Sequence, residues 1–271
     1  MFETGLGASL HTIEKNLTPE AIAAAAASRI ATVEIHPILF EKDSDGSMRA
    51  ALKETLRRTG IRPMTVHAPF GGAYDLSSLD EAVRREGLKV VLAAVDLAAE
   101  FGAPMVVVHA SAEPIAPEER PRRLEASRDS LRQVGERCAA TCRRAAVELL
   151  PRTCLGNTVE ELLALLEGLP ESVFGVCLDV NHLMDRMPAL PEAIRALGSR
   201  LITTHLSDYD GVDEKHWLPG KGSIDWAAAL AALKEIGYAG PMNFECSLPG
   251  ETPTERVRAL EASWDWLCTQ A

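Results

Sequence analysis

Seven short apolar runs in this 271-residue sequence each end on a histidine, an aspartate or a glutamate. These residues are Glu34, His67, His109, Glu148, Asp179, His205 and Glu245. From His67 onward they are spaced by 42, 39, 31, 26 and 40 residues, each about the length of a strand with its following helix. One such residue alone is usually structural. Seven in succession predict a shared site for metal binding or proton transfer.

Carboxylates gathered in one place repel one another unless a proton or a cation neutralises them, and a divalent metal ion is the economical solution. The candidate ligands, three carboxylates and one imidazole, are Glu148, Asp179, His205 and Glu245. This hard, oxygen-rich set suits Mn²⁺, Zn²⁺ or Mg²⁺ with open positions for substrate oxygens, and it does not suit a thiolate site. We therefore predict one bound divalent metal ion.

The stretch 201–226 has the highest density of such residues. Its apolar start, 201–204, is typical of a buried strand. After His205, the next seventeen residues include Asp208, Asp210, Asp213, His216 and Lys221, the last with a glycine on each side. We expect His216 and Lys221 to reach over the metal toward a substrate.

Strand-like and helix-like segments alternate along the whole chain. The predicted strands are 4–8, 31–35, 63–67, 105–109, 145–148, 173–179, 201–205 and 241–245. The predicted helices are 21–28, 50–58, 79–101, 124–143, 160–166, 192–197, 226–236 and 254–267. Thr18 with Pro19 is typical of a helix start, and Gly60 of a helix end.

Eight strand–helix units in about 250 residues predict an α/β fold, a (β/α)8 TIM barrel. Its active site would lie where the strands end, which is where the seven residues above fall. An open, doubly wound sheet is the alternative, but the Gly5–Ser9 turn is a weak match to its glycine-rich phosphate motif. No change of composition marks a boundary, so we predict a single domain over residues 1–271.

The composition narrows the classes of partner. A net charge of −11 disfavours a nucleic acid, whose phosphates need a basic surface. No apolar segment is long enough to span a membrane, and the N-terminal residues lack the pattern of a signal peptide. The six cysteines form no CxxC pair, although Cys138 and Cys142 lie one helical turn apart. We expect a cytoplasmic protein with reduced thiols.

Several motifs together resemble one family. They are TVHAPF (65–70), VVVHA (106–110), AVELLPRTCLGNT (146–158), CLDVNH (177–182), THLSDYDG (204–211), HWLPGKGSIDW (216–226) and NFEC (243–246). In this order they resemble the xylose-isomerase-like TIM barrels. That superfamily includes sugar phosphate isomerases and epimerases, ketose 3-epimerases, inosose dehydratases and the endonuclease IV type of repair enzyme. The resemblance covers nearly the whole chain and does not select one reaction.

The resemblance implies roles for particular residues. Glu148, Asp179, His205 and Glu245 match the four metal ligands of the epimerase branch. There, the two glutamates corresponding to Glu148 and Glu245 also exchange a proton on opposite sides of the substrate carbon. The other predicted pocket residues, which would contact substrate, are Glu34, His67, His109, His182, His216 and Lys221. Further specificity is expected from His11, 70–72 and Tyr74.

Two positions depart from the family pattern. The ketose 3-epimerases have a second glutamate six residues after the first metal ligand, where this chain has Cys154, which disfavours a free-ketose 3-epimerase. The loop glycines usually flank an acidic residue, and here they flank Lys221. That lysine either is solvated or pairs with an aspartate, or it binds a phosphate or carboxylate of the substrate.

These observations predict a metal-dependent isomerase or epimerase of a small sugar, sugar phosphate, sugar acid or cyclitol. It would abstract a proton α to a carbonyl and form an enediolate that the metal stabilises. Three alternatives stay open: a dehydratase on the same site, an endonuclease IV-like phosphodiesterase, and a binding barrel without activity. We expect a small polyhydroxylated substrate, no nucleic acid and no membrane partner, and leave open whether the chain forms a homo-oligomer.

Overall fold

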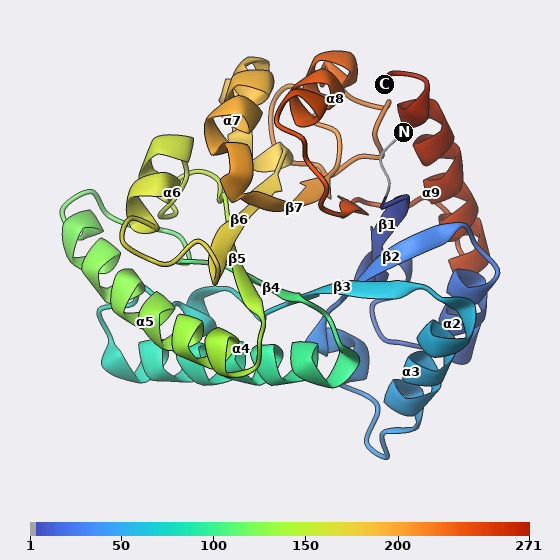
Figure 1. Ribbon diagram of the computed structural model, residues 1–271, viewed down its shortest axis with the longest axis horizontal. Coiled ribbons are helices and arrows are strands. Elements are labelled where there is room, and N and C mark those ends of the chain that lie inside the picture. Colours follow the sequence, from blue (N-terminus) through green and yellow to red (C-terminus); the bar gives the residue numbers. More distant parts are fainter. Residues whose placement is uncertain (1–3) are drawn as a thin grey trace.

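The computed structural model describes residues 4–271, so residues 1–3 of the predicted domain lie outside the described part. Eight parallel strands form a closed barrel in chain order, with β8 pairing with β1 (Figure 1). The strands are β1 (Leu6–Ser9), β2 (Ile30–Ile35), β3 (Arg62–His67), β4 (Met105–Val108), β5 (Arg144–Glu148), β6 (Phe174–Asp179), β7 (Leu201–Leu206) and β8 (Met242–Phe244). This closure confirms the predicted (β/α)8 barrel and excludes the open sheet.

Helices surround the barrel and cover the outer faces of its strands (Figure 1). The α-helices are α1 (Leu10–Ile13), α2 (Pro19–Ala26), α3 (Ser47–Thr59), α4 (Glu81–Phe101), α5 (Arg120–Ala140), α6 (Val159–Leu165), α7 (Leu190–Leu197), α8 (Trp226–Glu235) and α9 (Pro253–Cys268). The 3₁₀ segments are η1 (Pro37–Phe40), η2 (Gly72–Tyr74), η3 (Asn181–Ala189) and η4 (Gly198–Arg200). Helix α2 packs against α9 and completes the outer ring.

The helix signals read from the sequence act as expected. Thr18 caps α2 by accepting a hydrogen bond from the Ala21 N–H, and Pro19 occupies the first turn. Gly60 ends α3 with a φ of 76°, in the left-handed region that glycine adopts most easily. These local signals therefore mark the start of α2 and the end of α3.

Several elements differ from the prediction: α1 and the 3₁₀ segments were not predicted, and β4 and β8 end one residue before His109 and Glu245. Helix α5 begins at Arg120, four residues before the predicted start at residue 124. Pro121 is tolerated in its first turn because the N–H groups of that turn make no hydrogen bond within the helix, so the missing N–H of proline costs nothing there. The residues after β6 form η3, interrupted at Met184 with φ 55° and ψ −127°. That segment has no helical repeat of apolar residues, so the sequence pattern does not indicate it.

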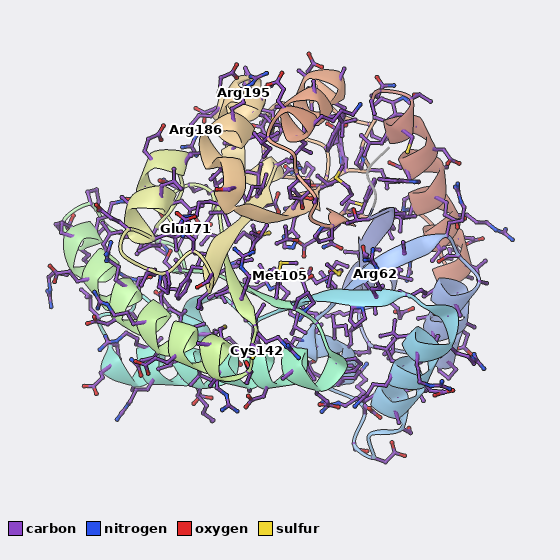
Figure 2. The ribbon with its side chains drawn as sticks, in the orientation of Figure 1. Arg62, Met105, Cys142, Glu171, Arg186 and Arg195 are labelled. Atoms are coloured by element: carbon purple, nitrogen blue, oxygen red, sulfur yellow. The ribbon has the colours of Figure 1, made fainter. Side chains whose placement is uncertain are left out.

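Inside the barrel, an apolar layer lies below the predicted site. Met105, Val107, Ala146, Cys177 and Ile202 are buried together there. Figure 2 shows Met105, at the start of β4, near the middle of the strand ring. Side chains two residues apart on a strand point to the same face, so Ala146 and Cys177 place their successors Glu148 and Asp179 inside the barrel as well.

No helix among residues 4–271 is both long and apolar enough to cross a membrane. All six cysteines are unpaired, as predicted. Cys138 is buried while Cys142 is exposed beyond the end of α5, and within the described chain neither belongs to a group of potential metal ligands. The structure therefore gives no support to a metal site at this cysteine pair.

Candidate active site

A cavity of about 440 Å³ opens where the strands end. The predicted residues that line it are His11, His67, Phe70, His109, Glu148, Asp179, His182, His216 and Glu245. A larger cavity of about 640 Å³ lies between η3 and α8 and is lined by none of the predicted residues. The smaller cavity is the candidate active site because the titratable groups converge there.

Glu34 is the centre of a hydrogen-bond network beneath this cavity. It is fully buried, and its carboxylate accepts hydrogen bonds from the hydroxyls of Ser9 (2.9 Å) and Thr65 (2.8 Å). Its Oε2 also lies 3.0 Å from Nε2 of His205. Because an ionised carboxylate only accepts, His205 must carry a proton on Nε2. The carboxylate therefore fixes both the orientation and the tautomer of this imidazole.

The other ring nitrogen of His205, Nδ1, faces two carboxylates. It lies 2.7 Å from Oε2 of Glu245 and 3.2 Å from Oε1 of Glu148. Burial lowers the pKa of His205, but the surrounding carboxylates raise it well above its ordinary value. A positive charge is thus required at Nδ1, and either a proton or a metal ion can supply it.

Glu148 also lies beside two further histidines. Its Oε2 is 2.9 Å from Nε2 of His109 and 3.3 Å from Nε2 of His67. His67 Nδ1 contacts the Ala68 carbonyl oxygen at 2.8 Å, which accepts the Nδ1–H bond. Burial lowers the pKa of His67, but Glu148 and the other nearby carboxylates raise it to about 9. Glu148 is therefore held as a carboxylate, with its pKa well below the ordinary value despite burial.

Asp179 ends the neighbouring strand and has one free oxygen. Its Oδ1 accepts a hydrogen bond from the Asn181 N–H at 2.8 Å, whereas its buried Oδ2 has no hydrogen-bond partner. His182 Nε2 lies 3.6 Å and His216 Nδ1 3.9 Å from Oδ2, beyond hydrogen-bond range. Burial raises the pKa of Asp179. A buried carboxylate oxygen without a donor is the environment that a cation would satisfy.

The ligand atoms fall into two adjoining groups, each with its atoms within 4.8 Å of one another. One group is His67, Glu148, His205 and Glu245, and the other is Asp179, His182 and His216. Three of the four predicted metal ligands therefore share a group, and Asp179 lies in the next one. The donor types and the unsatisfied Asp179 oxygen fit a divalent metal ion.

Two predicted substrate contacts lie elsewhere. Glu34 is buried beneath His205 and does not line the cavity, so it contacts His205 and not the space open to a substrate. Lys221 is exposed and does not line the cavity either. The preceding residue, Gly220, packs against Trp266 of α9, which directs this part of the loop toward the outside of the barrel. Neither residue reaches the position that the sequence pattern had predicted.

Some cavity residues were not placed in the site by the sequence pattern. Glu214 lines the cavity, and its buried Oε2 lies 3.6 Å from His182 Nε2. Its Oε1 pairs with Arg152 at 2.7 Å, and Arg152 also pairs with Glu113 and Asp213. The spacing Glu214-x-His216 is the one signal that could have indicated it. Arg152 joins three loops from different parts of the chain, which no local pattern reveals.

Asp208 organises the loop that brings His216 to the cavity. Its fully buried carboxylate accepts hydrogen bonds from the N–H groups of Tyr209, Gly220 and Ile224 and from the indole of Trp226, at 2.8 to 3.1 Å. A Cβ at Gly222 would lie 2.5 Å from Oδ1 of Asp208, so this turn has room only for glycine. Asp208 is therefore structural, although its position beside the ligands resembles that of a ligand.

We expect Asp208→Asn to reduce the free energy of unfolding by about 2 kcal/mol or more. Both oxygens of Asp208 accept from N–H groups, so the NH₂ of asparagine would replace one acceptor by a donor that faces other donors. Urea unfolding followed by circular dichroism measures this change. Asp210→Asn, two residues along the chain and half-buried, should change the value by less than about 0.5 kcal/mol, because both N–H groups bound by Asp210 meet its Oδ1, which the amide retains as an oxygen. Equal effects of the two substitutions would contradict the role of Asp208.

Comparison with a family model gives a match over residues 22–270, to the family described as xylose isomerase-like TIM barrel. An uncharacterised protein of Sinorhizobium fredii is 30% identical over 184 residues, which are 67% of this chain and 57% of that protein. The alignment thus spans little more than half of that relative. The L-ribulose-5-phosphate 3-epimerase of Escherichia coli O157:H7 is 23% identical over 229 residues, 84% of this chain and 79% of that protein.

A solved structure described as a D-tagatose 3-epimerase-like protein superposes with a TM-score of 0.82. It is 25% identical in sequence, and the match covers 98% of this chain and 96% of that one. The structural match therefore covers nearly the whole chain.

Proposed function

The chain belongs to the xylose isomerase-like TIM barrel family, and on this premise we propose that it is a divalent-metal-dependent isomerase or epimerase of a small sugar, sugar phosphate, sugar acid or cyclitol. The observation that carries the proposal is the convergence of Glu148 and Glu245 on Nδ1 of His205. Two carboxylates that flank one site can exchange a proton on both faces of a carbon. The relatives described as 3-epimerases support the same class of reaction.

The metal ligands in this proposal are Glu148, Asp179, His205 and Glu245. When bound there, a divalent ion supplies an electrophile for the carbonyl and hydroxyl oxygens of the substrate. The protein groups then orient and exchange protons. Glu245 turns Oε2 toward His205 and Oε1 toward the cavity, where Oε1 lies 3.7 Å from Nε2 of His11. We propose that this outer oxygen removes the proton α to the carbonyl and that Glu148 returns one from the other side.

The neighbouring histidines fix the positions of the protons. Nε2 of His67 and Nε2 of His109 lie beside Oε2 of Glu148 without forming a hydrogen bond to it, while Oε1 of Glu148 is directed at His205. His182 places Nδ1 2.8 Å from the Leu149 carbonyl oxygen, which accepts its N–H, and so presents Nε2 to the cavity. A substrate oxygen could bind there. Phe70, 51% exposed, stacks on His109 and offers an apolar face to the carbon chain of a sugar.

A phosphodiesterase is the second candidate, because the group Asp179, His182 and His216 could hold an additional ion. His67 and His109 beside Glu148 could hold a further one. A dehydratase needs the same base and metal as an epimerase, and the two differ only in whether a hydroxyl leaves. The number of ions per chain and the mass of the product separate these alternatives.

We expect that chelation abolishes proton exchange and that added Mn²⁺, Zn²⁺ or Mg²⁺ restores it by at least about 100-fold. The chain is treated with EDTA, reloaded, and incubated in D₂O with free and phosphorylated ketoses and with inososes. Nuclear magnetic resonance then follows the loss of C–H signals, and mass spectrometry detects loss of water. Exchange that persists in chelated protein would contradict the metal requirement.

Three ions per chain, together with cleavage of a phosphodiester and no exchange with any sugar, would favour the second candidate. One ion per chain with deuterium in the product would support the isomerase. Product lighter by one water would assign the dehydratase. Each outcome therefore identifies one of the three reactions.

A further inference from the structure

The cavity wall beside β1 carries a histidine that the proposed mechanism does not use. His11 lies in α1, is 29% exposed and lines the cavity with Thr12. Its Nε2 is 3.7 Å from Oε1 of Glu245, the carboxylate oxygen that points away from His205. His11 is therefore next to the place where a substrate carbon would meet Glu245.

The hydrogen bonds beneath His11 fix where its proton lies. The Ser9 hydroxyl donates its single proton to Oε1 of Glu34 at 2.9 Å, since that carboxylate has only acceptors to offer. The 2.9 Å contact between Ser9 Oγ and His11 Nδ1 must then be donated by Nδ1–H. A neutral imidazole with its proton on Nδ1 has a lone pair on Nε2. The network from Glu34 through Ser9 thus presents an acceptor to the cavity.

Two acceptors therefore face each other, Nε2 of His11 and Oε1 of Glu245. Their separation of 3.7 Å is too long for a direct hydrogen bond. A ligand hydroxyl located beside both atoms can donate to His11 while its carbon chain passes Glu245. A carbonyl, carboxylate or phosphate oxygen at the same place would meet only lone pairs and negative charge.

We propose that His11 is a specificity-determining residue whose Nε2 accepts a hydrogen bond from the β-hydroxyl of the substrate. This hydroxyl is on the carbon that follows the one facing Glu245, on the side away from the carbonyl. The inference rests on the proposed isomerase function and narrows its substrate class to compounds with a free hydroxyl at that carbon. Ser9 is a positioning residue, because it acts through His11.

The assignment also bears on the type of reaction. Expulsion of a β-hydroxyl requires a proton donor at the leaving oxygen. The lone pair of His11 retains the hydroxyl and cannot protonate it. His11 therefore favours reprotonation of the carbon, which gives an epimer or isomer, over loss of water.

The first test concerns the tautomer and does not depend on turnover. Long-range proton–nitrogen correlation spectra of the full chain should show His11 protonated at Nδ1 and unprotonated at Nε2. In Ser9→Ala, this preference for Nδ1 should be lost. A wild-type His11 protonated at Nε2 would overturn the proposal, even in an active epimerase.

The second test compares a ketose that the enzyme turns over with its 4-deoxy analogue, which can still exchange its C3 proton. Wild type should exchange the ketose about tenfold faster than the analogue, as expected for one lost hydrogen bond to a substrate hydroxyl. His11→Leu should make the two rates similar. His11→Gln, whose amide oxygen can accept, should restore part of the preference, which a general loss of folding would not do.

Equal wild-type rates for the ketose and its deoxy analogue would overturn the role of His11 while leaving the isomerase function intact. If no sugar exchanged although the tautomer is as described, the proposed function would fail, and the substrate contact of His11 would fail with it. Thermal unfolding of each variant shows whether the fold is retained.

Discussion

Glu245→Gln is expected to slow proton exchange into a sugar substrate by about 10²- to 10⁴-fold, the usual contribution of a positioned general base. The amide has nearly the shape of the carboxylate but cannot take up a proton. It also removes one negative charge beside His205, so the rates are compared at metal concentrations that saturate each variant. Deuterium incorporation followed by nuclear magnetic resonance gives both rates under identical conditions.

Glu251→Gln provides the matched control, because this exposed residue lies a few positions along the chain and outside the cavity. Its exchange rate should equal that of wild type. If Glu245→Gln retained the full rate at saturating metal, Glu245 would not be the acid or base. Glu148 would then be the remaining candidate for that role.

Glu34→Gln is expected to weaken metal binding by about 10- to 100-fold, although residue 34 does not line the cavity and is not one of the proposed metal ligands. The carboxylate accepts the Nε2–H of His205 and makes Nδ1 a stronger ligand. Glutamine has one acceptor oxygen and no charge, so it stabilises the His205 imidazole less well. Its NH₂ group would also face one of the groups that now donate to the carboxylate. Titration of the chelated protein with Zn²⁺ against a fluorescent competitor measures the affinity.

Thr65→Val is the control for this change. It removes the 2.8 Å hydrogen bond to the same carboxylate but retains the charge of Glu34 and its contact with His205. Its effect on metal affinity should stay below about threefold, because one neutral hydrogen bond is lost at a distance from the metal. Equal losses for the two variants would mean that general disturbance of the buried network, and not the Glu34–His205 contact, weakens the binding.

The barrel could be predicted from sequence because each element carries its own local signal. Thr18 and Pro19 mark the start of α2 and Gly60 the end of α3 through local backbone chemistry alone. The apolar strands end near polar residues at regular intervals. The closed order of strands follows from these alternating units. The same regularity brings His205 and Glu245 to one end of the barrel, as predicted, with His205 Nδ1 2.7 Å from the carboxylate.

The positions that the sequence did not reveal depend on contacts between distant residues. Glu34 lies near the end of its strand, as the other site residues do, yet it is buried deeper, where Ser9, Thr65 and His205 contact it. Lys221 follows the ligand loop closely in sequence but faces solvent because Asp208 folds that loop back on itself. A strand-end position thus indicates the end of the barrel but not the depth of the side chain.

The residues expected to recognise a substrate and the residues proposed to carry out the reaction come from different parts of the barrel, which has a consequence for evolution. The carboxylates proposed to hold the metal lie at the ends of β5 and β6 and directly after β8, whereas His11, Thr12 and Phe70 come from the segments that follow β1 and β3. Mutations in these early segments can alter which molecule is recognised without displacing the groups that carry out proton transfer. Such a division allows one reaction to be kept while descendants of the same ancestor acquire different substrates.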